Sequence, residues 1–114
     1  MYPIYHIAIR SDWDKAPAGG AYTHPSLSRE GYIHCSAARQ VVRVADAFYA
    51  GQEGLVLLEI DPERSGAEVR WEDGGAGELF PHVYGPIPVG AVLRAFEFQP
   101  DAHGRFKLPP GLDS

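Results

Sequence analysis

Residues 77–86, GELFPHVYGP, are the stretch around which this chain is organised. The run places a carboxylate, Glu78, and an imidazole, His82, four residues apart among aromatic side chains. A glycine-rich segment, residues 74–77, precedes it, and Pro81 cannot donate to a sheet ladder. We therefore expect a mobile loop that leads into an edge strand or a bulge. Titratable side chains on an interrupted strand are typical of a functional site, although a solvated surface strand explains the same pattern equally well.

The length and composition predict one domain, residues 1–114, with a core of ordinary size. The chain has 114 residues, of which 45% are hydrophobic. The net charge of −5 and the lack of a Lys/Arg run argue against extended nucleic acid as a partner, but leave a short nucleotide or a capped RNA end open. The single cysteine, Cys35, excludes an intramolecular disulfide and fits a reducing compartment. No leader pattern or membrane-length apolar run occurs, so we expect a cytoplasmic protein without a membrane partner; no oligomeric state is indicated.

Three apolar runs give the strongest strand patterns: Ile4–Ile9, Leu55–Ile60 and residues 93–99. The second is apolar until Glu59, which favours a central strand covered on both faces. Residues 68–72 alternate as a half-exposed strand should. We expect one or two packed antiparallel sheets.

Two helices are predicted in the first half of the chain. Ser11 is a candidate N-cap for a short helix, and Ser36 for a second helix over residues 37–49. Four apolar residues of the second helix recur at three- and four-residue spacing: Val41, Val44, Ala45 and Phe48. We expect this stripe to be buried, with Phe48 as its anchor.

The remaining segments are predicted to be loops and turns. Residues 21–29 are a loop by composition, residues 87–92 hold a single helical turn, and residues 101–104 form a hairpin turn. The resulting fold class is α+β, with mostly strands and two short helices in the N-terminal half.

Polar exceptions stand on three of the apolar runs. His6, His34 and the pair Glu78/His82 could converge on one cleft, although a lone histidine such as His6 is more often a core residue with satisfied hydrogen bonds. Cys35 is interpreted as a small buried hydrophobe, because no basic neighbour would lower the pKa of its thiol.

Metal and hydrolase sites have weaker support. His6, His34, His82 and Glu78 offer zinc ligands, but no His-x-His, His-Glu-x-x-His or Cys-x-x-Cys spacing occurs. No Gly-x-Ser-x-Gly motif or phosphate-binding glycine loop is present either. We therefore predict no metal and keep a His/Glu metal-dependent hydrolase as the least favoured alternative.

Four ordered blocks resemble a known family: residues 5–8 (YHIA), 30–36 (EGYIHCS), 55–61 (LVLLEID) and 77–86. They look like the signature blocks of a small bacterial family, domain of unknown function 952, and the likeness spans nearly the whole chain. That family is thought to share the fold of the ADP-ribosyltransferases, including the RNA 2′-phosphotransferase branch. The resemblance thus implies an ADP-ribosylation-like split antiparallel sheet that encloses a nucleotide cleft.

The resemblance also implies roles for individual residues. His6 matches the first-strand residue that holds the adenosine ribose, residues 32–36 resemble the second-strand motif, and Glu78 falls where the catalytic glutamate precedes an apolar strand. The sequence departs from the ADP-ribosyltransferase pattern at His34, which replaces a tyrosine or serine. The predicted site has Glu78 and His34 as catalytic groups, with ligand contacts from His6, Tyr32, Ser36 and His82.

The chemistry implied is cleavage of the nicotinamide–ribose bond, with NAD as a substrate and no obligatory cofactor. That cleavage develops positive charge, which a carboxylate such as Glu78 would stabilise. The imidazoles of His6 and His34 would position ribose hydroxyls or a diphosphate. The function expected is that of an ADP-ribosyltransferase-like or NAD-glycohydrolase-like transferase. The alternative is a non-catalytic nucleotide-binding or interaction module.

Overall fold

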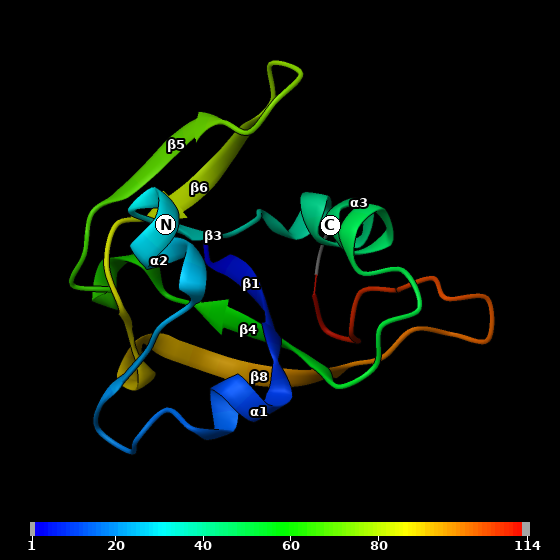
Figure 1. Ribbon diagram of the computed structural model, residues 1–114, viewed down its shortest axis with the longest axis horizontal. Helices are drawn as coiled ribbons and strands as arrows, with labels where there is room; N and C mark the ends of the chain where they lie inside the picture. Colours follow the sequence, from blue (N-terminus) through cyan, green and yellow to red (C-terminus); the bar gives the residue numbers. More distant parts are fainter. Residues whose placement is uncertain (1, 113–114) are drawn as a thin grey trace.

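A computed structural model describes residues 2–112 of the chain. Its elements follow one another as β1 (Ile4–Ile9), α1 (Arg10–Asp14), β2 (Ala21–Tyr22), α2 (Pro25–Glu30), β3 (Ile33–His34), α3 (Ala38–Phe48), β4 (Leu55–Ile60), η1 (Pro62–Arg64), β5 (Val69–Asp73), β6 (Leu79–Val83), β7 (Ile87–Pro88), η2 (Val89–Ala91) and β8 (Val92–Phe98). All strand pairs are antiparallel, so the protein is a mixed α+β fold with antiparallel sheets and few helices, as predicted (Figure 1).

The first sheet has the order β1-β4-β8. The three apolar runs of the sequence form its strands, and every residue of the middle strand, β4, is buried. Side chains of β4 alternate between two apolar clusters, because successive residues of a strand point to opposite faces. Val56, Leu58 and Ile60 belong to one cluster. Leu55 and Leu57 belong to the other. The prediction of a central strand covered on both faces is confirmed.

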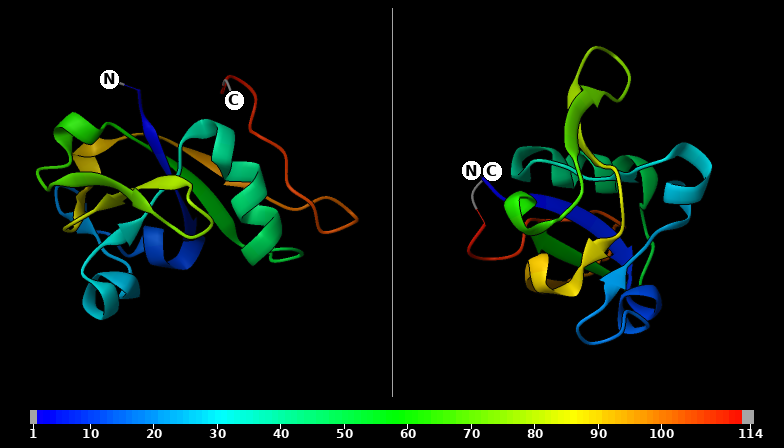
Figure 2. Two further views of the ribbon diagram at one scale, coloured as in Figure 1. Left: turned by 90° about the horizontal axis from the view of Figure 1, so that it is seen from above. Right: turned by 90° about the vertical axis from the view of Figure 1, so that its left-hand side faces the viewer.

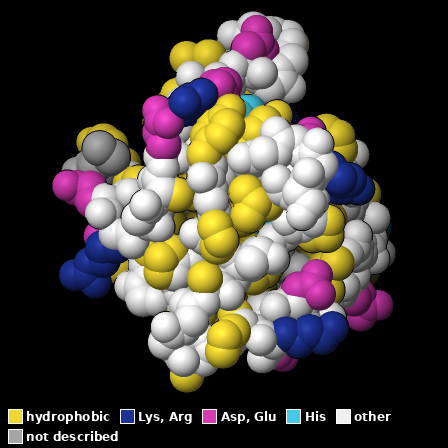
Figure 3. Space-filling model, turned by 60° about the vertical axis from the view of Figure 1, so that its left-hand side comes forward, with side chains coloured by type: hydrophobic (Ala, Val, Ile, Leu, Met, Phe, Trp, Pro, Cys, Tyr) yellow, Lys and Arg dark blue, Asp and Glu magenta, His cyan; other side chains and the backbone are white. Residues whose placement is uncertain are grey.

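The second sheet has the order β3-β6-β5. Its two longer strands, β5 and β6, form a hairpin that stands out from the body of the molecule (Figures 2 and 3). The short strand β3 pairs Ile33 with Val83 and His34 with His82. A further pair, β2 with β7, forms a small sheet of two strands.

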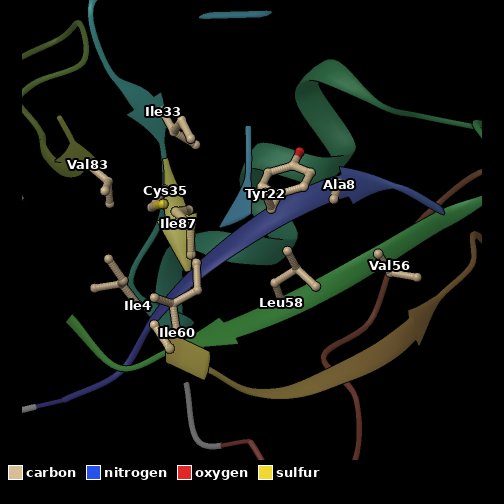
Figure 4. Close-up of a cluster of buried hydrophobic side chains, with 11 residues drawn as sticks. Ile4, Ala8, Tyr22, Ile33, Cys35, Val56, Leu58, Ile60, Val83 and Ile87 are labelled. Atoms are coloured by element: carbon tan, nitrogen blue, oxygen red, sulfur yellow. The ribbon is translucent and has the colours of Figure 1, made fainter. Parts of the chain in front are cut away.

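The apolar cluster between the two sheets gathers side chains from many elements. Ile33 and Val83 come from the second sheet, Ile87 from β7, and Ile4 and Leu58 from the first (Figure 4). The other cluster lies between the first sheet and α3, where Val41 and Ala45 pack with Tyr5, Leu57 and Phe98. The two sheets and α3 are therefore fixed relative to one another by burial.

Residues 21–29 are not a loop, which corrects the prediction. They contain β2 and most of α2, so the described chain has three α-helices rather than two. Pro25 occupies the first turn of α2, and the ring of His24 caps it by accepting from the Ser26 N–H at 3.1 Å. Gly31 ends the helix with φ of 90°. Histidine is not among the usual capping residues, which explains why this helix was not predicted from the composition of the segment.

Both predicted serine caps are wrong. The residue that precedes α1 is Ile9, and no side chain caps that helix. At the start of α3, Ala37 donates its N–H to the side chain of Gln40 at 2.8 Å. Ser36 instead exchanges two backbone hydrogen bonds with Tyr5, at 2.7 and 2.8 Å. These bonds connect β1 to the segment that follows β3.

Two further expectations are corrected. Phe48 does not anchor the buried stripe of α3, because it is 77% exposed at the end of the helix. Pro81 does not lie on an edge strand, because β6 is the middle strand of its sheet. The sheet tolerates this proline because β3 pairs only with His82 and Val83, and Pro81 contributes its carbonyl by accepting from the Cys35 N–H at 3.0 Å.

The predicted turns at 87–92 and 101–104 are present. The first contains η2, and in the second Gly104 donates its N–H to the Asp101 carbonyl at 2.9 Å. Within residues 2–112, none of the helices has the length and apolar character needed to span a bilayer.

Candidate functional site

A cavity of about 570 Å³ opens between β1, β3, the C-terminal part of α3 and the β5–β6 hairpin. We call it the histidine cavity. Its polar lining comprises His6, His24, Glu30, Tyr32, His34, Ser36, Asp73 and His82, and its larger hydrophobic side chains are Tyr5, Ile7, Val44, Phe48, Tyr49 and Phe80. Five of the six residues predicted for the site therefore lie around one cavity. Glu78 is not among the lining residues.

His6 occupies the middle of β1 and is almost fully buried. Its Nδ1 lies 2.6 Å from the carbonyl oxygen of His34, and its Nε2 lies 2.9 Å from the hydroxyl of Tyr22. A carbonyl only accepts, so Nδ1 carries the proton and Nε2 accepts from Tyr22. Burial lowers the pKa of His6 to about 4, which keeps the ring neutral at neutral pH. Because both ring nitrogens bond to the protein, only the ring surface of His6 is available to a ligand.

His82, on β6, is held by a carboxylate that the sequence analysis did not single out. Its Nδ1 lies 2.9 Å from Oε1 of Glu72, and the Tyr84 hydroxyl donates to the same oxygen. These two bonds, that of Tyr84 first, lower the pKa of Glu72, so the carboxylate is ionised and can only accept. His82 therefore carries a proton on Nδ1. Its Nε2 has no hydrogen-bond partner among the described residues.

The ring of Tyr32 fixes the plane of His82. The two rings stack with centroids 4.0 Å apart and an angle of 15° between their planes. Glu72 could have been found from the hairpin register, since Arg70 pairs with His82 and Glu72 with Phe80. That register makes Glu72 a diagonal neighbour of His82 on one face of the sheet.

His34 lies beside His82 across the β3–β6 pair, with ring centroids 5.3 Å apart. Its side chain is about half exposed, and its Nε2 lies 2.8 Å from Oε2 of Glu30. This bond lowers the pKa of Glu30. The sequence analysis predicted His34 as a site residue but did not identify Glu30 as its hydrogen-bond partner.

His24 is a third residue that the sequence analysis missed. Its Nδ1 accepts the N–H of Ser26, so the proton of the neutral ring is on Nε2, which has no hydrogen-bond partner among the described residues. Its ring meets that of His6 edge to face at 5.4 Å. Burial, followed by the charge of His34, lowers the pKa of His24. A histidine before a proline in an expected loop carried no signal for this position.

Ser36 and Cys35 follow β3, and their side chains lie in different surroundings. Ser36 is buried and lines the cavity, and within residues 2–112 its hydroxyl has no hydrogen-bond partner. The Cys35 side chain packs in the apolar cluster between the sheets, and burial raises the pKa of its thiol. The interpretation of Cys35 as a small buried hydrophobe is confirmed.

Glu78 connects the hairpin to α3. Its side chain is 33% exposed, and its Oε2 accepts from Arg43 at 2.6 Å and from Gln40 at 3.0 Å. These bonds, that of Arg43 first, lower the pKa of Glu78. Gln40 is fully buried and also donates to the carbonyl of Leu79 at 2.9 Å. In this geometry Glu78 holds two elements together beside the cavity.

No three His, Cys, Asp or Glu side chains between residues 2 and 112 are grouped so that they could hold a metal ion. The zinc ligands considered from the sequence bond instead to other side chains. His6 bonds to Tyr22, His34 to Glu30, and Glu78 to Arg43.

Comparisons with known proteins place the chain in a family. The family model described as "Protein of unknown function (DUF952)" matches residues 7–95. The X-ray crystal structure of protein CC0527 from Caulobacter crescentus is 36% identical, with a TM-score of 0.83 over 93% of this chain and 94% of that chain. The solution NMR structure of the same protein is 37% identical, with a TM-score of 0.79 over 92% and 91% of the two chains. No curated protein matches. The chain thus belongs to the DUF952 family of proteins of unknown function.

Proposed function

We propose that the histidine cavity binds a small nucleotide-like ligand. The observation that supports this proposal is convergence: His6, Tyr32, His34, Ser36 and His82, from three separate parts of the sequence, line one cavity. The volume of about 570 Å³ also lies in the range of ordinary small-molecule sites, roughly 300–1,000 Å³.

The lining matches the two parts of a nucleoside. Val44, Phe48 and Phe80 offer apolar surface for a planar base. The Nε2 atoms of His24 and His82 and the hydroxyl of Ser36 have no hydrogen-bond partners among the described residues. They can bond to ribose hydroxyls.

Binding is better supported than transfer. The transferase hypothesis assigns Glu78 to the developing positive charge of an NAD-derived ribose, with His34 as a second catalytic group. Glu78, however, is bonded to Arg43 and Gln40 outside the lining, and would have to leave both partners to reach a ligand. The non-catalytic nucleotide-binding module is therefore the favoured form of the proposal. ADP-ribosyl transfer, NAD hydrolysis and the ADP-ribosylation-like split sheet form the competing version.

The test is calorimetric titration of the purified protein with adenosine, nicotinamide riboside, ADP-ribose and NAD, with chromatographic detection of released nicotinamide. We expect binding that is weakened in His82→Gln and unchanged in His103→Gln, an exposed histidine outside the cavity. Binding without nicotinamide release supports the module. Release that is lost in Glu78→Gln, with affinity kept, would support the transferase instead. A protein that binds none of the four compounds overturns the proposal.

A further inference from the structure

The charged residues of the histidine cavity are acidic. Its lining contains two carboxylates, Glu30 and Asp73, and neither Lys nor Arg. A third carboxylate, Glu72, bonds to His82. Glu30 bonds to His34 and Glu72 to His82, so the imidazoles of both residues already face carboxylates.

Arginines on neighbouring elements are committed elsewhere or lie outside the lining. Arg43 is paired with Glu78, and Arg70 with Glu68 at 2.9 Å while its guanidinium lies 4.6 Å from the centre of the Tyr84 ring. Arg29 of α2 is exposed and is not part of the lining.

The cavity also lacks the backbone geometry that phosphates use. Protein sites for phosphate present Arg or Lys, or free N–H groups at the start of a helix. His24 precedes α2 and lines the cavity, but the N–H groups of Ser26 and Leu27 both bond to His24 itself. Residues 37–40 begin α3 but do not line the cavity, and the Ala37 N–H is occupied by the side chain of Gln40. A di- or triphosphate in the histidine cavity would therefore meet carboxylates without a cation to balance them.

For the uncharged hydroxyl groups of a ligand, in contrast, the cavity has both hydrogen-bond donors and acceptors. With Nδ1 donating to Glu72, the neutral ring of His82 has Nε2 as an acceptor, and with Nδ1 accepting from Ser26, the neutral ring of His24 has Nε2 as a donor. The Ser36 hydroxyl can do both. This pattern suits a sugar hydroxyl that donates to one ring and a second that accepts from the other.

From these observations we infer that the cavity is selective for an unphosphorylated, nucleoside-like ligand, neutral or cationic, over its phosphorylated forms. This inference rests on the proposed function and specifies its ligand class. The sugar would be held by His24, Ser36 and His82, and the base by the apolar part of the lining.

The experiment compares two matched series at low ionic strength by calorimetry: adenosine, AMP and ADP, and nicotinamide riboside, its mononucleotide and NAD. We expect each phosphate to weaken binding, so that ADP binds about tenfold or more weakly than adenosine, as like charges near a protein surface require. Added salt should reduce this difference in affinity, because screening weakens the repulsion between the phosphates and the carboxylates.

Charge-removal variants identify the cause. In Glu30→Gln/Asp73→Asn the gap between adenosine and ADP should narrow, and an asparagine at position 73 can still accept the Gly75 N–H that Asp73 accepts at 2.7 Å. Glu53→Gln removes one exposed carboxylate outside the lining and should leave the gap unchanged.

The outcomes separate this inference from the proposed function. If ADP or NAD binds as tightly as the nucleoside or more tightly, the inference is overturned while a nucleotide-binding cavity remains. If the difference in affinity between adenosine and ADP persists in the double variant, or is reduced equally in Glu53→Gln, the carboxylates of the cavity are not its cause. The inference then fails. If no member of either series binds, the proposed function fails and the inference falls with it.

Discussion

The two larger sheets of this protein are stabilised in different ways. In the β1–β4–β8 sheet the middle strand is buried on both faces by apolar clusters. The β5–β6 hairpin of the other sheet has an exposed tip, and its side chains make polar bonds: Glu72 with His82, and Glu78 with Gln40 and Arg43. The first sheet is thus stabilised mainly by apolar burial, and its buried titratable groups are His6 on β1 and Glu59, which accepts from Arg94 at 2.8 Å. The second forms one wall of the cavity, and its geometry depends on which side chains are ionised.

The largest effect is expected in the apolar sheet. Leu57→Ala, at a fully buried position of β4, should lower the free energy of unfolding by about 2–5 kcal/mol, as large-to-small core substitutions do. Leu79→Ala, at a 52% exposed position of the hairpin, is the matched control and should cost less than about 0.5 kcal/mol. Urea unfolding of both variants measures the difference. Equal losses would contradict the contrast between the two sheets.

The next effect concerns His6, which connects the two regions through the carbonyl of His34. Its pKa is lowered from 6.5 to about 4 by burial, so the unfolded chain binds a proton at a higher pH than the folded one. The stability from neutral His6 is complete above pH 6.5 and falls as the pH drops toward 4. It levels off below that value, after a total loss of about 3 kcal/mol.

Urea unfolding at several pH values between 4 and 7 measures this loss. In His6→Gln the group cannot titrate, so the fall in stability across this window should be smaller by a similar amount. If His6→Gln shows the same pH dependence as the native chain, His6 is not the source of the effect.

The contrast between the regions also explains what the sequence could predict. The strands β1, β4 and β8 follow apolar runs whose pattern is local, so their positions are predictable from β-branched and aromatic content. The same patterns singled out His6, His34, Glu78 and His82 as polar exceptions on expected strands, and the three histidines line the cavity whereas Glu78 does not.

The polar partners could not be predicted in the same way. Glu78 meets Gln40 and Arg43 across 38 and 35 residues of sequence, and no local pattern indicates such a pair. The helix α2 was missed because its cap is a histidine rather than a serine, threonine or aspartate. Three-dimensional packing determines which distant side chains bond to each other, so the sequence alone identifies only candidate residues.

A local effect is expected from Glu78→Gln. The amide keeps the shape but loses the charge that holds Arg43, so backbone amides of the hairpin should exchange hydrogen faster while the global unfolding transition hardly moves. Because the pKa of Glu78 is lowered in the fold, its contribution is present above the ordinary carboxyl range and is lost as the pH falls through the lowered value.

Glu68→Gln is the matched control for this variant. Glu68 also pairs with an arginine, but its partner Arg70 is two residues away on the same hairpin, so the pair links no separate elements. Hydrogen exchange of the hairpin should be unchanged in Glu68→Gln. Faster exchange in both variants would show that the link to α3 is not what stabilises the hairpin.

The smallest effect on stability is expected from Phe48→Ala, although the sequence pattern favoured a large one. Phe48 is 77% exposed at the end of α3, so its removal should cost less than about 0.5 kcal/mol of unfolding free energy. Val41 of the same helix is fully buried, and Val41→Ala should cost about 2 kcal/mol by the same urea measurement. Phe48 also lines the cavity, so under the proposed function its variant should bind adenosine more weakly even though it is stable. A stability loss in Phe48→Ala that matches that of Val41→Ala would mean that Phe48 is packed against the body of the protein rather than exposed at the cavity.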